Sequence, residues 1–298
     1  MPKWIESSDC VTLDVAQGVA RITLNRPDKR NAINGVLLRE LKQALLEADD
    51  LTAVNAIVLQ GAGRDFCAGY DLVTTYGERK QDEADPSAYR GVIKSFDDDC
   101  WKMERMAEAV NLMAAIHKPI VCKVQGNCLA GGTDLALACD MVIASDSARI
   151  GFPATRANGS PPAHMWFYHV GPQWAKRLLL TGDSLNGRDA AKIGLVMDAV
   201  PDAELDAEVD ELARRLSFVD AELLSTNKRI VNLALELSGS NTLQRLALEN
   251  DARAHLSQGP RRAQFKADME ASGLKEALKN RDAPFGDGMI KLRARGNA

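Results

Sequence analysis

The sequence lacks the cysteine pairs that would mark a disulfide framework or a zinc site. Its cysteines show neither a CxxC pair nor zinc-like spacing, and they are scattered along the chain: Cys10, Cys67, Cys100, Cys122, Cys128 and Cys139. Scattered single cysteines are typical of reduced, mostly buried thiols that act as small hydrophobic side chains. We therefore expect a protein of a reducing compartment.

Long apolar runs and a large net charge are also missing. The first residues, MPKWIESSDC, contain no apolar signal-peptide core, and no later stretch reaches about 18 apolar residues. The formal net charge of −4 provides no general electrostatic attraction to nucleic acid or to an anionic membrane. We expect a cytoplasmic protein with neither nucleic acid nor membrane as its partner.

The 298 residues are enough for one large domain with a sizeable core. Residues 11–15 and 19–27 read as strands around the turn Gln17-Gly18, and an apolar helical stripe follows over residues 31–50 with Asn34 as its cap. The wholly apolar stretch AIVLQG is typical of a strand in a sheet that is covered on both faces. The sequence therefore predicts an α/β fold.

The pattern changes along the second half of the chain. A polar, acidic stretch over residues 74–87 predicts a loop, and a helix is expected from about residue 97 to residue 117. Strand and helix alternate until about residue 201, and the pattern beyond is helical to about residue 280. We expect an α/β core followed by an all-helical tail.

The segment GNCLAGGTDLALACD places Gly131 and Gly132 at the start of a helix and Asp134 in its first turn. Unshielded amides at a helix start favour an anion or a developing oxyanion. Structural explanations remain open for both features, since glycines are common in strand-to-helix turns and acids are common in a helix first turn.

A second segment, DFCAGYDL, follows an apolar strand and places Ala68 and Gly69 at a turn. An amide from this turn and one from Gly131 could converge on one oxygen atom. Two converging amides form an oxyanion hole of the kind that stabilises the enolate of a thioester.

Four segments together resemble the enoyl-CoA hydratase/isomerase (crotonase) superfamily: LNRPDKRNAIN, FCAGYDL, KPIVCKVQGNCLAGGTDLALACD and LTGDSLNGRDAAKIGLV. The resemblance implies a crotonase-like spiral of ββα units over residues 1–201. It also implies a helical C-terminal trimerisation region over residues 202–298, in a homotrimer or homohexamer. The implied substrate is an acyl-CoA thioester, with coenzyme A as part of the substrate and no separate cofactor.

The resemblance also assigns roles to residues. Ala68 and Gly131 would supply the oxyanion-hole amides, and Asp71 would anchor the loop that carries the first of them. Members that hydrate enoyl-CoA carry two glutamates; the first position is Asp134 here and the second is Ala154. Asp134 is therefore the predicted catalytic acid, and no second acid stands where the family has one.

His164 is a candidate for the missing group, because histidine is a common general base near neutral pH. The alternative is a packing role, since His164 stands among methionine, tryptophan and phenylalanine. No metal site is expected: His164 and His169 are five residues apart and match no metal motif.

Coenzyme A carries phosphates that basic side chains would bind. By resemblance the CoA-binding residues are expected to be Arg26, Lys29, Arg30, Ala68, Asp71 and Phe285. For the basic cluster in NRPDKRN, a solvated charged turn is the alternative.

The predicted function is enoyl-CoA hydratase or isomerase chemistry through a stabilised enolate. The alternatives are dienoyl-CoA isomerisation, C–C or thioester hydrolysis, and acyl-CoA binding without hydration. RNA binding, which one branch of the superfamily performs with a lysine-rich first helix, is not expected, because residues 35–50 contain four acids against Arg39 and Lys42.

Overall fold

The computed structural model describes residues 2–77 and 95–292. Its strands are β1 (Val11–Ala16), β2 (Val19–Leu24), β3 (Ala56–Gly61), β4 (Ile120–Val124), β5 (Asn127–Leu129), β6 (Met141–Ser145), β7 (Arg149–Gly151), β8 (Ser184–Asn186) and β9 (Asp198–Val200). Its helices are α1 (Gly35–Asp50), α2 (Leu72–Gly77), α3 (Phe96–Ala115), α4 (Gly131–Leu137), α5 (Trp166–Thr181), α6 (Gly187–Lys192), α7 (Leu205–Ser217), α8 (Ala221–Leu237), α9 (Ser240–His255) and α10 (Pro260–Asp282). Short 3-10 turns include η3 (Pro153–Arg156) and η5 (Ala283–Phe285).

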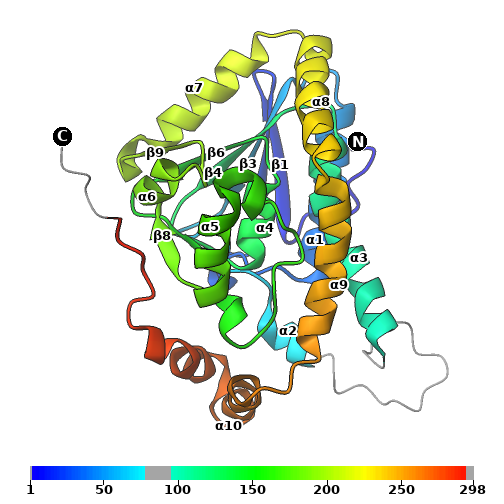
Figure 1. The fold of residues 1–298 in the computed structure, drawn as a ribbon. Helices are drawn as coiled ribbons and strands as arrows, with labels where there is room; N and C mark the ends of the chain where they lie inside the picture. The colour runs from blue at the N-terminus through cyan, green and yellow to red at the C-terminus, as the bar shows by residue number, and fades with distance from the viewer. Residues whose placement is uncertain (1, 78–94, 293–298) are drawn as a thin grey trace, which may run out of the picture.

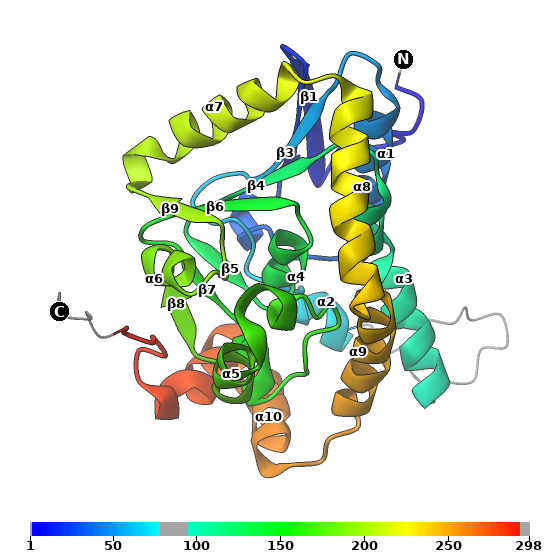
Figure 2. The ribbon, with the colours of Figure 1, turned by 45° about the horizontal axis from the view of Figure 1, so that its top comes forward.

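The main sheet has six strands in the order β1-β2-β3-β4-β6-β9 (Figure 1). β1 and β2 pair antiparallel, as predicted, and every other pair in this sheet is parallel. The hairpin turn uses Gln17 and Gly18, both with positive φ, as a tight two-residue turn requires. A smaller sheet, β5-β7-β8, lies beside α4 (Figure 2).

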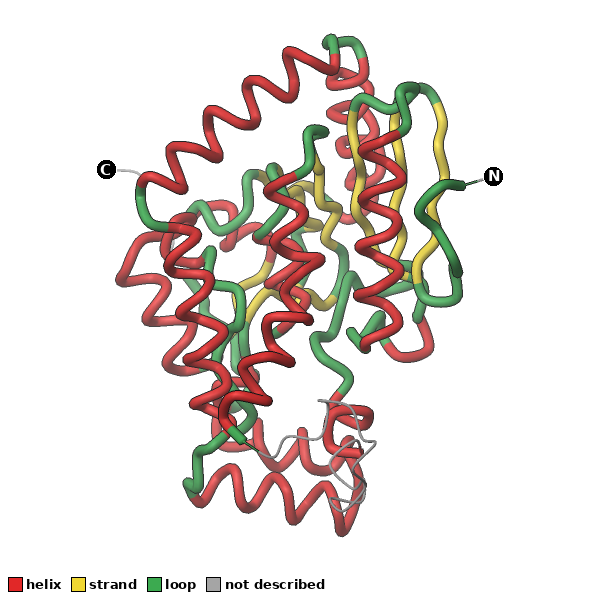
Figure 3. The backbone as a smooth tube through the Cα atoms, turned by 90° about the vertical axis from the view of Figure 1, so that its right-hand side faces the viewer, coloured by secondary structure: helices red, strands yellow, loops and turns green. Residues whose placement is uncertain are grey.

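Helices lie on both faces of the central strands of the main sheet, while β1 forms a largely exposed edge (Figure 3). In β3, Ile57 and Leu59 join the cluster that contains α1, while Val58 faces the cluster of α7. The expectation from AIVLQG is confirmed. The predicted cap of α1 is also confirmed, because the Leu37 amide donates to Asn34 Oδ1 at 2.9 Å.

The tail is mainly helical from α7 to η5, and it is not detached from the core. α7 packs on the main sheet, α9 packs against α3, and α10 crosses below the core (Figures 1 and 2). The predicted boundary at residue 201 therefore coincides with a change in secondary structure and not with a gap in packing.

One local expectation is wrong in part. The stretch over residues 74–87 was expected to be a loop, but residues 74–77 belong to α2. The rest of this stretch, from residue 78, lies outside the described residues. Among the described helices, none combines the length and apolar composition that crossing a membrane requires.

Candidate active site

A cavity of about 820 Å³ lies where the core meets the tail helices. Its walls come from the turn before α2, the segment entering α4, η3 and the turn after it, and one face each of α3, α9 and α10. Residues on these walls include Ala68, Tyr70, Asp99, Ala130, Ala154, Ser160, Asp251, His255 and Lys275. The cavity thus joins both predicted glycine-containing segments to the tail.

Two amides remain available at the junction of these segments. The Ile33 amide donates to the Gly69 carbonyl, and the Asp71 amide donates to the Ile33 carbonyl, each at 2.8 Å. In this parallel bridge between Ile33 and Tyr70, the amide of Tyr70 points away from the segment that contains Ile33. Neither the Tyr70 amide nor the Gly131 amide donates a hydrogen bond within the described chain. A Cβ on Gly69 would lie 3.3 Å from the Gly131 nitrogen, so the two segments approach closely.

The Ala68 amide is engaged, because it donates to the Arg30 carbonyl at 3.0 Å. Ala68 lines the cavity, but its N–H group is occupied by this bond. The amide without a bond stands two residues later in the chain, at Tyr70. The sequence pattern did not reveal this, because the direction of each amide depends on pairing with residues 30–33.

Gly131 and Gly132 occupy positions where a side chain has no room. A Cβ on Gly131 would lie 2.7 Å from Tyr70 Cε2, and one on Gly132 would lie 2.5 Å from the Cys67 carbonyl oxygen. Both distances are shorter than ordinary contact. The glycines therefore allow the segment of residues 67–70 to pack directly against the start of α4.

Asp134 is buried, with 2% of its surface exposed. Burial raises the pKa of its carboxyl well above the usual value, the charge of Asp251 raises it further, and hydrogen bonding from Tyr70 and the Ala163 backbone opposes the rise. The Tyr70 hydroxyl lies 3.5 Å from Asp134 Oδ2, and Tyr70 itself lines the cavity. Asp134 is thus a buried acid that holds its proton more tightly than an exposed aspartate does, and it contacts the cavity wall through Tyr70.

The position of the absent second acid, Ala154, lies on the cavity wall. His164, the predicted alternative, is not among the residues that line this cavity. Its amide donates to Gln244 Oε1 at 2.6 Å, and burial lowers the pKa of its ring. The structure therefore does not bring His164 to the site where a second acid is missing.

Three residues that were not predicted do reach the cavity: Asp99, Asp251 and His255. Asp251 Oδ1 accepts a hydrogen bond from the Ser160 amide at 2.9 Å and lies 3.7 Å from His255 Nε2. His255 Nδ1 lies 2.8 Å from Asp99 Oδ2. A sequence signal existed in the spacing of Asp251 and His255, four residues apart on one helix, but that spacing is equally typical of a solvated helix face.

This chain of acid, imidazole and acid is largely buried. Asp251 is 5% exposed and Asp99 is 1% exposed. Burial raises the pKa of Asp251 to about 6, and the charge of Asp99 adds to the rise, while His255, the Ser160 amide and Arg262 lower it. Asp251 is therefore mainly ionised at pH 7.

The predicted basic residues fall into two groups. Lys29 and Arg30 line the cavity, as do Ala68 and Asp71. Arg26 does not line it; its guanidinium pairs with Asp71 at 3.0 Å and also donates to the Ala32 carbonyl. Arg26 thus ties the first basic turn to the segment before α2.

Phe285 lies in η5, after α10, and is 38% exposed. The guanidinium carbon of Arg156 lies 4.0 Å from the centre of its ring, in a cation–π contact. Phe285 is not one of the residues on the cavity wall within this chain.

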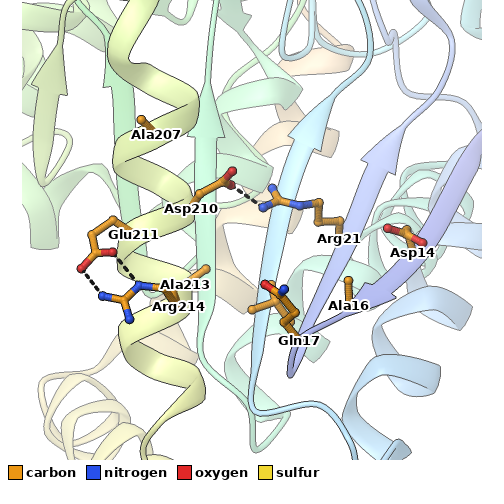
Figure 4. Close-up of a pocket in the computed structure, with 10 residues that line it drawn as sticks. Asp14, Ala16, Gln17, Arg21, Ala207, Asp210, Glu211, Ala213 and Arg214 are labelled. Carbon is orange, nitrogen blue, oxygen red and sulfur yellow. Dashed lines mark hydrogen bonds and ion pairs between the residues drawn. The ribbon is translucent and has the colours of Figure 1, made fainter.

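A second, smaller cavity of about 320 Å³ lies between the β1–β2 hairpin and α7 (Figure 4). Four of its charged side chains form two pairs: Arg21 with Asp210, and Arg214 with Glu211 at 2.7 Å. Within the described ranges, no group of three or more acids, histidines or cysteines is arranged to hold a metal ion. The larger cavity is therefore the candidate active site.

Comparison with known proteins agrees with this architecture. Residues 14–271 match the family described as Enoyl-CoA hydratase/isomerase. The chain is 30% identical over 238 residues to the probable enoyl-CoA hydratase echA8 of Mycobacterium bovis, covering 79% of this chain and 86% of that protein. It is 31% identical over 242 residues to the 1,2-epoxyphenylacetyl-CoA isomerase of Escherichia coli, covering 80% and 86%.

Among solved structures, an enoyl-CoA hydratase from Mycobacterium smegmatis superposes with a TM-score of 0.85 at 35% identity, over 94% of this chain and 96% of that one. The predicted α/β crotonase fold is confirmed by this likeness. Residues 14–271, which match the family, include Tyr70, Gly131 and Asp134 and the whole of α9, which carries Asp251. The chain belongs to the enoyl-CoA hydratase/isomerase family of crotonase-fold enzymes.

Proposed function

We propose that this enzyme binds the thioester carbonyl of an enoyl-CoA at the amides of Tyr70 and Gly131 and adds the elements of water across the C2–C3 double bond. The observation that carries the proposal is the pair of unengaged amides beside the buried Asp134, whose pKa burial raises. Such donors stabilise the enolate oxygen more than the ground-state carbonyl, and one donor is typically worth about 2.7–4 kcal/mol.

The amide of Tyr70 takes the role that the sequence pattern assigned to Ala68. The supporting reason is hydrogen-bond accounting: the Ala68 amide already donates to Arg30, whereas the Tyr70 amide has no acceptor in the described structure. A bound thioester oxygen would satisfy the Tyr70 and Gly131 amides together.

Asp134 supplies the proton that C2 of the enolate receives. Burial raises its pKa well above the usual value and so favours the protonated carboxyl, which suits a general acid. Tyr70 contacts Asp134 and lines the cavity, so the Tyr70 hydroxyl gives its own proton to C2 and takes the proton of Asp134 in its place. Hydrogen bonds of this kind are often long before substrate binds.

The carrier would lie along the basic side of the cavity. Lys29 and Arg30 face it from the turn before α1, and Lys275 and Lys279 face it from α10. These cations suit the phosphates of coenzyme A, which enters as part of the substrate, and no further cofactor is proposed. Free cysteines at all six positions support a reducing compartment such as the cytoplasm.

We also propose that the chain assembles as a homotrimer or homohexamer through its tail. Helix α8 leaves Ile230, Val231 and Leu237 between 61% and 81% exposed. Apolar side chains gathered on one helix are typical of a surface that another chain covers.

The test is the loss of conjugated enoyl-thioester absorbance when purified enzyme meets a panel of enoyl-CoA esters, beginning with crotonyl-CoA. Asp134→Asn should reduce kcat by about 10²–10⁴-fold, the range for loss of one general acid. Asp198→Asn, which removes an exposed carboxylate on β9, serves as the control and should leave kcat unchanged. Full activity in Asp134→Asn would contradict the proposal.

A further inference from the structure

We propose that Asp251, delivered by tail helix α9, is the second catalytic carboxylate, the base that activates water at the position where the chain has Ala154 instead of an acid. This inference rests on the proposed hydration and names the group that hydration still needs. It makes the tail helix a part of the active site.

The placement of Asp251 is the first support. Asp251 and Ala154 line the same cavity, together with Tyr70, whose amide and hydroxyl serve the substrate. The turn after η3 comes so close to Asp251 that a Cβ on Gly159 would lie 2.6 Å from Asp251 Oδ1. This turn is tied to η3, because the Gly159 amide donates to the Ala154 carbonyl at 3.2 Å, and Asp251 therefore stands against the segment that follows the position of the missing acid.

The surroundings of Asp251 are the second support. Its Oδ1 accepts the Ser160 amide at 2.9 Å, and His255 lies 3.7 Å away on the next turn of α9. His255 is itself held by Asp99 at 2.8 Å. The carboxylate is therefore positioned by a backbone donor and by an imidazole that a second buried acid orients, while the residue retains access to the cavity.

The contrast with Asp134 is the third support. The pKa of Asp134 is raised well above its usual value, and no cation is among the groups that oppose the rise. The pKa of Asp251 is raised by burial to about 6, because His255, the Ser160 amide and Arg262 oppose the rise, so Asp251 is mainly ionised at pH 7. Two interacting carboxyls whose pKa values differ in this way provide an acid and a base at one pH. The titratable and charged groups around Asp251 are His255 on α9, Asp99 on α3, Asp134 on α4, Arg262 on α10 and Tyr70.

In the proposed step, Asp251 removes a proton from water while the water oxygen bonds to C3 of the enoyl thioester. The C2–C3 π electrons move toward the thioester oxygen, which the two amides stabilise. C2 then takes the proton supplied by Asp134. Asp251 afterwards releases its proton to water and Asp134 regains one, so that one water molecule is consumed and no net proton.

His255 is a positioning residue in this scheme, because it acts through Asp251. Asp251→Asn keeps an oxygen that can accept the Ser160 amide, so it preserves the turn while removing the base. Glu249→Gln is the matched control: it makes the same change at an exposed acid on the same helix. Circular dichroism and size-exclusion chromatography would verify that each variant is folded.

Two reactions separate this inference from the proposed function. Hydration of enoyl-CoA needs both carboxyls, whereas exchange of the C2 protons of butyryl-CoA with D2O needs the amides and Asp134 but no attacking water. Asp251→Asn is expected to lose hydration by about 10²–10⁴-fold and to retain the exchange, and Asp134→Asn is expected to lose both.

Full hydration by Asp251→Asn would overturn this inference and leave the proposed function standing. Equal loss of both reactions in Asp251→Asn would also overturn it, because it would show a general disturbance of the site. Exchange without hydration of any enoyl-CoA in the unmodified enzyme would overturn both the inference and the proposed hydration, but would leave the enolate chemistry intact.

The pH profile gives a readout that a structural role would not move. kcat/KM of the unmodified enzyme should fall below about pH 6, where Asp251 becomes protonated. In His255→Gln the fall of kcat/KM at acidic pH should remain but should begin at a higher pH, because His255 lowers the pKa of Asp251. If kcat/KM of His255→Gln no longer fell at acidic pH, the base would be the imidazole of His255, and the inference would be overturned.

Discussion

The hydroxyl of Tyr70 lies 3.5 Å from Oδ2 of Asp134 and forms the connection between this buried acid and the cavity. Tyr70 therefore acts twice, with its backbone amide at the oxyanion and its hydroxyl at the proton donor. The two roles belong to different atoms, so they can be separated by substitution.

Tyr70→Phe is expected to lower kcat by at least about tenfold and to leave KM nearly unchanged. The substitution removes only the hydroxyl, which carries the proton, and it keeps the ring and the amide that bind substrate. Steady-state kinetics with the preferred enoyl-CoA measures this. An unchanged kcat would show that Asp134 reaches the substrate without Tyr70.

Gly131→Ala is expected to reduce activity and to lower the free energy of unfolding by about 1–3 kcal/mol, because the added methyl group would lie 2.7 Å from the Tyr70 ring. Gly35→Ala is the matched control, since no atom lies within 4 Å of its added Cβ. This control should be neutral or raise the free energy of unfolding by up to about 1 kcal/mol. Urea titration of both variants compares them directly.

Asp251→Asn is expected to raise the free energy of unfolding at pH 7.5 by up to about 3 kcal/mol. The pKa of Asp251 is about 6 in the folded protein against an ordinary value of 3.8, so the folded state binds the proton more tightly. Its contribution to stability is complete below about pH 3.8 and is lost as the pH rises through about 6. At higher pH the buried charge opposes folding by about 1.4 kcal/mol for each pH unit between these values.

The measurement is urea unfolding of Asp251→Asn and the unmodified protein from pH 4 to pH 8. The difference between the two should grow through this range and level off above about pH 7. If the difference in the free energy of unfolding did not depend on pH, this result would contradict the raised pKa of Asp251.

Ile230→Glu is expected to lower the assembly state, because it places a charge on the apolar face of α8. Leu180→Glu on α5 introduces the same charge at a position that is also exposed, 78% against 61% for Ile230, and should leave assembly unchanged. Light scattering after size exclusion distinguishes three or six chains from one. Dissociation by the α5 variant alone would move the proposed interface to α5.

Much of the local structure follows from sequence patterns. Asn34 caps α1, the Gln17-Gly18 turn closes the β1–β2 hairpin, and the apolar stretch at residues 56–61 forms a covered strand. These features depend on neighbours a few residues apart, so side-chain periodicity and turn chemistry are sufficient to predict them.

The site was predictable only where its residues stand together in the chain. Gly131 and Asp134 are three residues apart in one short helix, and both contact Tyr70, which lines the cavity. Whether Ala68 or Tyr70 offers its amide depends on the bridge to Ile33 and on the Arg30 carbonyl, both more than 30 residues away. No local pattern contains that information.

The amino-acid sequence was sufficient to predict the family, the order of helices and strands, and an acid beside two small residues at the start of a helix. Which amides remain without an acceptor, and the presence of Asp251 in the same cavity as Ala154, became evident from the folded chain. The physical reason is that hydrogen-bond partners and burial arise from the packing of distant segments, here α9 against α3, and the same packing sets the pKa of Asp251.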